Sequence, residues 1–189
     1  VKKLIKAQRM RGPDQEGIFI SVDRSCVMGN NRLAIVDPNA QLKLPFRDSD
    51  EKHVLSFNGE IYNYRELAKE LESRGCKFKT KTDTEVLYRG LQEFGANFIS
   101  RLDGMFAWAF YDGQTKNLTL ARDILGERHL FYIVTENELI FANEAHALLH
   151  ALPEKAKLDF DPIAAVCAIR YYSAPSGRTL ISQIKRLRG

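Results

Sequence analysis

The hydrophobic pattern is clearest in the middle of the chain, where a short apolar run precedes residues at helical spacing. Residues 54–57 read Val-Leu-Ser-Phe, which is typical of a buried strand. Apolar side chains then recur every three or four residues from Tyr64 to Leu71, and this spacing predicts an amphipathic helix over 64–74. Asn58-Gly59 is therefore expected at the end of a strand, just before a helix.

A second apolar run, residues 105–111, has no polar face. As a strand it would carry Met105, Ala107, Ala109 and Tyr111 on one side, and Phe106, Trp108 and Phe110 on the other. A strand that is apolar on both sides has to lie between two covering layers.

The remaining pattern predicts short strands, with helices in two clusters. A helix is expected to end near residue 11, and Thr82 with Glu85 forms a candidate capping box for a helix that ends at Gly95. Strands are expected over 17–22, 26–28, 118–121, 130–134 and 138–142, and further helices over 144–150 and 162–170. The last three strands read as an antiparallel meander, and 38–53 as a polar loop. This order predicts an α+β domain in which two antiparallel sheets pack face to face with helices outside.

Composition narrows the class of protein. A length of 189 residues suits one domain with a sizeable core. With 28 basic and 24 acidic residues, the net charge of +4 is too small and too scattered to predict a nucleic-acid partner or an anionic membrane. No apolar stretch is long enough to span a membrane. The three widely spaced cysteines predict neither a disulfide framework nor a metal site, so a cytoplasmic protein without a metal is expected.

The Asn58-Gly59 pair is the first candidate for chemistry. An Asn amide beside a Gly N–H can provide two donors for a developing oxyanion, and Gly allows the backbone to approach a ligand closely. The alternative is a hairpin, because Asn-Gly is also a common two-residue turn. Residues 60–64 do not read as a strand that returns to pair with 54–57, which favours the oxyanion role.

Six motifs carry a resemblance to a known family, and they occur in one order along the chain. They are Arg11-Gly12-Pro13-Asp14, the run from Asn31 to Asp37, the run from Phe57 to Tyr64, Thr82-Asp83-Thr84-Glu85, the run from Leu102 to Ala107, and Ala121-Arg122-Asp123-x-x-Gly126. Together they closely resemble the glutaminase domain of asparagine-synthetase-type class II glutamine amidotransferases. The resemblance implies one such domain over residues 1–189 and the four-layer αββα sandwich of the N-terminal-nucleophile hydrolases.

The resemblance also implies a reaction and a site. An N-terminal cysteine attacks the side-chain amide of glutamine, a thioester forms, and ammonia passes to an ATP-dependent synthetase domain. Asn58 and Gly59 match the oxyanion hole, Arg32 matches the group that binds the α-carboxylate, and Asp83 matches the group that binds the α-ammonium. The rest of the pocket matches Glu60, Ile35 and Val36. Taken singly, Arg32 could be a surface arginine and Asp83 a helix cap.

The chain also departs from the family pattern. It begins at Val1 without Met-Cys-Gly, and Cys26, Cys76 and Cys167 are internal, so none has a free α-amine. We therefore expect a domain that is truncated before its first strand, lacks the nucleophile and is inactive as a 189-residue polypeptide. Asn30 stands where His is usual. The run from Glu127 to His129 replaces Ile/Val-Lys-Pro.

No Ser-Gly-Gly-x-Asp-Ser loop is present, so ATP and Mg are expected only in a C-terminal synthetase domain outside this chain, and no cofactor in this one. Two alternatives remain open at this point. One is a catalytically inactive amino-acid-binding or structural module of the same fold, and the other is an amidotransferase domain that serves a different acceptor. The sequence leaves a homodimer open.

Overall fold

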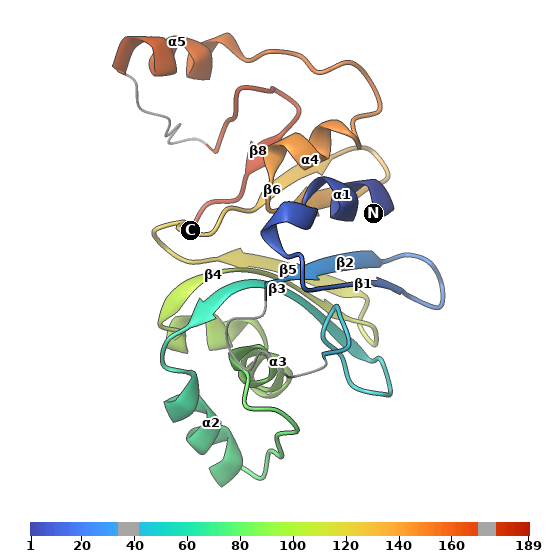
Figure 1. Ribbon diagram of the computed structural model, residues 1–189, viewed down its shortest axis with the longest axis vertical. Helices are drawn as coiled ribbons and strands as arrows, with labels where there is room; N and C mark the ends of the chain where they lie inside the picture. Colours follow the sequence, from blue (N-terminus) through green and yellow to red (C-terminus); the bar gives the residue numbers. More distant parts are fainter. Residues whose placement is uncertain (34–41, 170–176) are drawn as a thin grey trace.

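The computed structural model describes residues 1–33, 42–169 and 177–189 (Figure 1). Helices and short 3₁₀ turns alternate with eight strands in these parts of the chain. In order they are α1 (Lys2–Ala7), η1 (Arg9–Arg11), β1 (Gln15–Ile20), β2 (Val27–Arg32), β3 (His53–Ile61), α2 (Tyr64–Ser73), α3 (Asp83–Phe94), η2 (Gly95–Arg101), β4 (Gly104–Asp112), β5 (Asn117–Arg122), β6 (Phe131–Val134), β7 (Leu139–Ala142), α4 (Ala145–Leu149), α5 (Phe160–Ile169) and β8 (Lys185–Arg186).

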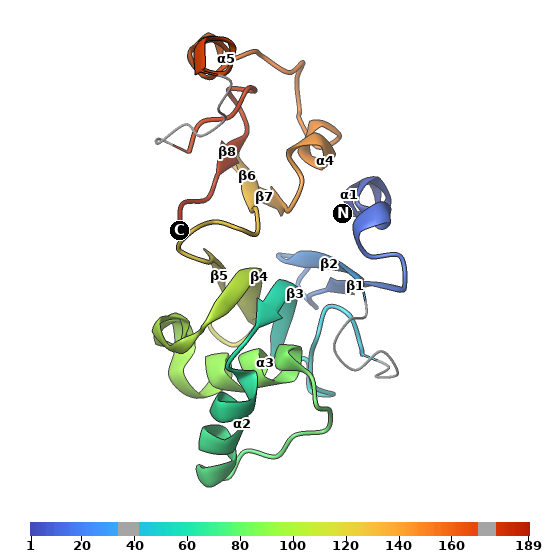
Figure 2. The ribbon, with the colours of Figure 1, turned by 60° about the vertical axis from the view of Figure 1, so that its left-hand side comes forward.

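The strands form three antiparallel sheets, with the orders β1-β2, β3-β4-β5 and β7-β6-β8. Helices α2 and α3 lie below the β3-β4-β5 sheet, and the other sheets lie above it (Figures 1 and 2). Helices α1 and α4 pack together with β6 and β7 around a separate apolar cluster. The predicted α+β arrangement of packed antiparallel sheets with outer helices is confirmed.

Strand β4 is the centre of the core, as its two-sided apolar pattern predicts. Phe106, Trp108 and Phe110 belong to the cluster that packs against α2 and α3. Ala109 and Tyr111 point to the opposite cluster, which β1 and β2 complete. Burial is nearly total on both sides, because every residue from 106 to 111 is less than 9% exposed.

Strand β3 differs from its prediction. It does not end at residue 57 but runs on to Ile61, and Asn58 and Gly59 pair with Ala107 and Phe106 of β4. The expectation of a strand end at Asn58-Gly59 is therefore wrong, and so is the hairpin alternative, because the partner strand lies more than forty residues downstream. The strand continues because Gly59 takes a positive φ of 153° and so lets the backbone of β4 approach it closely.

The predicted meander is also wrong at one step. Strands β4 and β5 form one hairpin and β6 and β7 another, but β5 and β6 lie in different sheets. The far edge of β6 is taken by β8, a two-residue strand with no periodicity that a sequence could reveal. The predicted 38–53 loop is described from residue 42 onward, where Phe46 bridges to Leu55.

The predicted capping box at α3 is half formed. The Thr82 Oγ1 accepts a hydrogen bond from the backbone N of Glu85 at 3.2 Å, so Thr82 caps the helix. The Glu85 carboxylate does not accept the second hydrogen bond of a capping box, from the backbone N of Thr82. It accepts hydrogen bonds from the backbone N atoms of Lys79 and Thr80 instead. Gly95, with φ of 60°, follows the last helical residue, as predicted.

Candidate functional site

A cavity of about 350 Å³ lies where the end of β2, the second half of β3 and the start of α3 meet. Its lining includes Arg32, Asn58, Gly59, Glu60 and Asp83. These are all the predicted site residues that the structure describes. Ile35 and Val36 lie outside the described residues.

Asn58 and Gly59 enter this cavity from β3. No residue in the described part of the chain hydrogen-bonds the Asn58 side-chain amide, so that amide is available to a ligand. A glycine is required at position 59 because the backbone of β4 lies close to it. A Cβ atom here would lie 2.1 Å from the backbone O of Met105. The pair thus places a side-chain amide and a residue without a side chain next to each other on one strand.

Arg32 is the last residue of β2 and pairs with Gln15 of β1. Its Nη1 donates a hydrogen bond to the Gln15 Oε1 at 3.0 Å, which orients the guanidinium at the end of the hairpin. A guanidinium carries five donors in a planar fork, a geometry that suits bidentate binding of a carboxylate. Arg32 is half-buried and lines the cavity, which argues against the alternative of a surface arginine without a role in the site.

Asp83 is the first residue of α3 and is only 5% exposed. It is not the helix cap, because Thr82 has that role. Its Oδ2 accepts a hydrogen bond from the backbone N of Ile61 at 3.1 Å, and its Oδ1 accepts one from the backbone N of Thr84 at 2.8 Å. Burial and the nearby charge of Glu60 raise the pKa of Asp83 above its ordinary value. The two hydrogen bonds from backbone N atoms act in the opposite direction and lower it.

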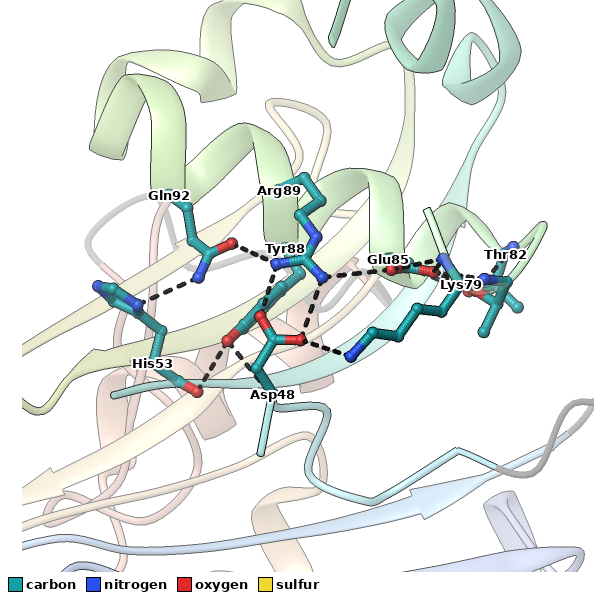
Figure 3. Close-up of polar contacts among 9 residues, drawn as sticks. Asp48, His53, Lys79, Thr82, Glu85, Tyr88, Arg89 and Gln92 are labelled. Atoms are coloured by element: carbon teal, nitrogen blue, oxygen red, sulfur yellow. Dashed lines mark hydrogen bonds and ion pairs between the residues drawn. The ribbon is translucent and has the colours of Figure 1, made fainter. Parts of the chain in front are cut away.

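A polar network on α3 holds the segment that forms another part of the cavity wall (Figure 3). Arg89 binds the Asp48 carboxylate with both terminal nitrogens, at 2.5 and 3.0 Å. The Tyr88 hydroxyl donates to the backbone O of His53 at 3.2 Å, and burial raises the pKa of this tyrosine to about 12. These contacts fasten residues 42–53 to α3, and this segment supplies Leu42, Leu44 and Phe46 to the cavity lining.

Comparison with known proteins identifies the family. Residues 1–189 match a family described as a glutamine amidotransferase domain. The chain belongs to this family. As the resemblance predicted, its relatives include asparagine synthetases.

Three curated relatives illustrate the similarity. Asparagine synthetase 1 of Bacillus subtilis (strain 168) is 34% identical over 177 residues, which cover 94% of this chain and 27% of the relative. Asparagine synthetase B of Escherichia coli (strain K12) is 38% identical over 148 residues, or 78% of this chain and 26% of the relative. A putative asparagine synthetase of Mycobacterium tuberculosis (strain ATCC 25618 / H37Rv) is 36% identical over 191 residues, or 95% and 29%. The chain thus spans less than a third of each relative.

Solved structures support the predicted fold. The glutamine phosphoribosylpyrophosphate amidotransferase from B. subtilis superposes with a TM-score of 0.53 and 26% identity, over 65% of this chain and 28% of that one. The amidotransferase domain therefore has the predicted fold of the N-terminal-nucleophile hydrolases. The ligand-binding roles of its cavity residues stay predictions.

The amidotransferase cavity also contains polar residues that sequence reasoning did not assign to it. These are Arg11, Asn30, Asn31, Thr84 and Arg128. Asn30 and Arg128 stand at two of the places where the chain departs from the family motifs, and that departure was the available signal. The Asn30 Oδ1 accepts a hydrogen bond from the Ser56 Oγ at 2.8 Å, which ties β2 to β3 beside the cavity.

Within residues 1–33, 42–169 and 177–189, no group of three or more His, Cys, Asp or Glu side chains could hold a metal ion. None of the helices in the same ranges has the length and apolar character needed to cross a membrane.

Proposed function

We propose that the cavity binds L-glutamine and that the domain hydrolyses its side-chain amide, supplying ammonia to an ATP-dependent synthetase domain that forms asparagine. The observation that carries this proposal is the convergence of Arg32, Asn58, Gly59, Glu60 and Asp83 on one cavity. Family membership and the asparagine synthetases among the relatives support the reaction and the acceptor.

The charges of the cavity suit a zwitterionic amino acid. In our proposal the Arg32 guanidinium binds the α-carboxylate of glutamine through two parallel hydrogen bonds. Asp83 and Glu60 face the α-ammonium. Binding a cation beside these carboxylates offsets the cost of ionising Asp83 in a buried place. The side-chain amide then extends toward Asn58 and Gly59.

Asn58 and Gly59 would act on the oxyanion that forms when a nucleophile attacks the side-chain amide. Donors that are in place before the reaction stabilise this charge without reorganising. The nucleophile in our proposal is a cysteine with a free α-amine, which serves as its base. Cys26 does not suit this task, because burial and the nearby charge of Asp23 raise its pKa to about 11, and none of the three cysteines lines the cavity.

Ammonia release from L-glutamine tests the reaction directly. The 189-residue polypeptide is expected to bind glutamine, and hydrolysis is expected to require an N-terminal cysteine as the nucleophile. The native gene product is expected to release ammonia, and Asn58→Ala is expected to lower its kcat by roughly 10²–10³-fold. Asn97→Ala, an exposed asparagine on η2, is the matched control and should have no effect.

A second candidate function is a module that binds an amino acid without hydrolysing it. The observation in its favour is that Cys26, Cys76 and Cys167 are not among the described residues that line the cavity. The two candidates separate in the same assay, since a non-catalytic module would bind glutamine and release no ammonia even as the native gene product. In our proposal the domain itself needs no cofactor and works in the cytoplasm, with ATP and Mg used by the synthetase domain.

A further inference from the structure

We propose that Arg128 is a second guanidinium of the glutamine cavity and binds the substrate α-carboxylate together with Arg32. The inference rests on the proposed function, because it needs a substrate with a carboxylate. It assigns a binding role to a residue that stands at a departure from the family motifs.

The first observation is the state of the Arg128 side chain. It lines the cavity together with Arg32 and Asn58. Its Nε is buried and has no hydrogen-bond partner among the described residues. The terminal nitrogens of the same guanidinium are the donors that would bind a ligand carboxylate in the cavity.

The second observation is that the other arginines of the cavity already have partners. Arg11 forms an ion pair with Glu144. Arg32 donates to the Gln15 side chain. Of the three cavity arginines, Arg128 is the one for which no ion pair or side-chain hydrogen bond is formed within the part of the chain that the structure describes.

The third observation is that the backbone of Arg128 is fixed relative to the strand that carries Asn58 and Gly59. The Asp123 Oδ2 accepts hydrogen bonds from the backbone N atoms of Arg128, at 3.0 Å, and of Phe106, at 3.3 Å. Phe106 is the β4 residue that pairs with Gly59. A guanidinium on such a support is positioned before the ligand arrives, as a binding residue should be.

Two ligands that differ by one group test the inference. Binding of L-glutamine and of 4-aminobutanamide, which lacks the α-carboxylate, is measured by calorimetry on the 189-residue chain. Arg128→Met is expected to weaken L-glutamine binding by about ten-fold or more, the size typical of a lost hydrogen bond to a charged group. Binding of 4-aminobutanamide should change by less than about two-fold, since that ligand has no carboxylate to lose contact with.

Arg101→Met is the matched control, because Arg101 is an arginine that forms an ion pair with Glu70 and does not line the cavity. It should leave the affinities for both ligands nearly unchanged. Circular dichroism and thermal unfolding show whether each variant is folded, and Arg128→Lys, which keeps the charge, should recover part of the L-glutamine affinity.

Two results would overturn the assignment. Equal weakening of both ligands by Arg128→Met would mean that Arg128 only shapes the cavity, and no change for L-glutamine would mean that it has no role in binding. Failure of the unaltered chain to bind L-glutamine is a different result, because it rejects the proposed function and this inference with it.

Discussion

At the scale of single residues, Gly59 carries the strictest requirement of the site. Its φ of 153° is unfavourable for any side chain, and a Cβ would meet the Met105 backbone O at 2.1 Å. The neighbouring strand cannot withdraw without breaking the pairing of β3 with β4. The close approach of two strands, rather than a turn, therefore explains the glycine.

Gly59→Ala is expected to destabilise the domain by about 2–3 kcal/mol, because strain and a backbone clash act together. Gly75→Ala is the control, since Gly75 also has a positive φ, of 94°, but nothing within 4 Å of an added Cβ. It should cost only about 1 kcal/mol. Urea unfolding measures both, and equal costs would contradict the close approach.

Asp83 gives the proposed site a pH dependence. Burial, together with the charge of Glu60, raises the pKa of Asp83 in the empty cavity, and only the ionised form attracts an ammonium group. Binding of L-glutamine should therefore weaken as the pH falls through this raised pKa, with a midpoint above that of an ordinary aspartate. Binding near that pH should release protons, because the bound ammonium favours the carboxylate.

Calorimetry in buffers of different ionisation enthalpy measures this proton release. Asp83→Asn should bind L-glutamine weakly at every pH and release fewer protons. Unchanged proton release in Asp83→Asn would assign the titration to another group.

At the scale of elements, α3 both carries Asp83 and holds the segment that forms part of the cavity wall. The first residue of the helix is Asp83. Arg89, almost two turns later, binds the Asp48 carboxylate (Figure 3). This contact holds the segment that carries Leu44 and Phe46 against the helix. The ion pair is well shielded, with exposed side-chain fractions of 15% and 21%. Such a pair fixes geometry more strongly than one on the surface.

Arg89→Met is expected to destabilise the domain by about 2 kcal/mol, because it leaves the Asp48 carboxylate without its strongest partner. It should also weaken glutamine binding, since the wall loses its anchor. Lys157→Met removes an exposed ion pair with Glu154 and should cost less than about 1 kcal/mol. Denaturant unfolding and calorimetry check both, and equal costs for the two variants would mean that the clamp contributes no more than a surface pair.

Elements also show where sequence reasoning succeeds and fails. Periodicity predicts the helices α2 and α3 and the strand β4, because the spacing of apolar residues within each element determines which of its faces is buried. The full length of β3 did not follow, since Asn-Gly has a local preference for turns that pairing with β4 overrides. The split of β5 and β6 between sheets, and the pairing of β8, depend on contacts that no local pattern encodes.

At the scale of the whole molecule, the site exists only because distant segments meet. Arg32 comes from β2, Asn58 and Gly59 from β3, and Asp83 from α3. The order of six motifs was enough to predict this convergence through the resemblance. It did not reveal that Arg11 and Arg128 line the cavity, because their entry depends on how the chain packs around it, although Arg11 lies in one of the motifs and Arg128 at a departure from the family pattern.

The central claim is that this cavity recognises both charged groups of glutamine, and one set of binding measurements tests it. Calorimetry compares L-glutamine with 4-aminobutanamide, which lacks the carboxylate, and with 4-carbamoylbutanoate, which lacks the ammonium. Arg32→Met should weaken only the ligands that have a carboxylate, and Asp83→Asn only those that have an ammonium, by about ten-fold each. If each variant weakened all three ligands equally, or if the unaltered chain bound none of them, the glutamine site described here would be wrong.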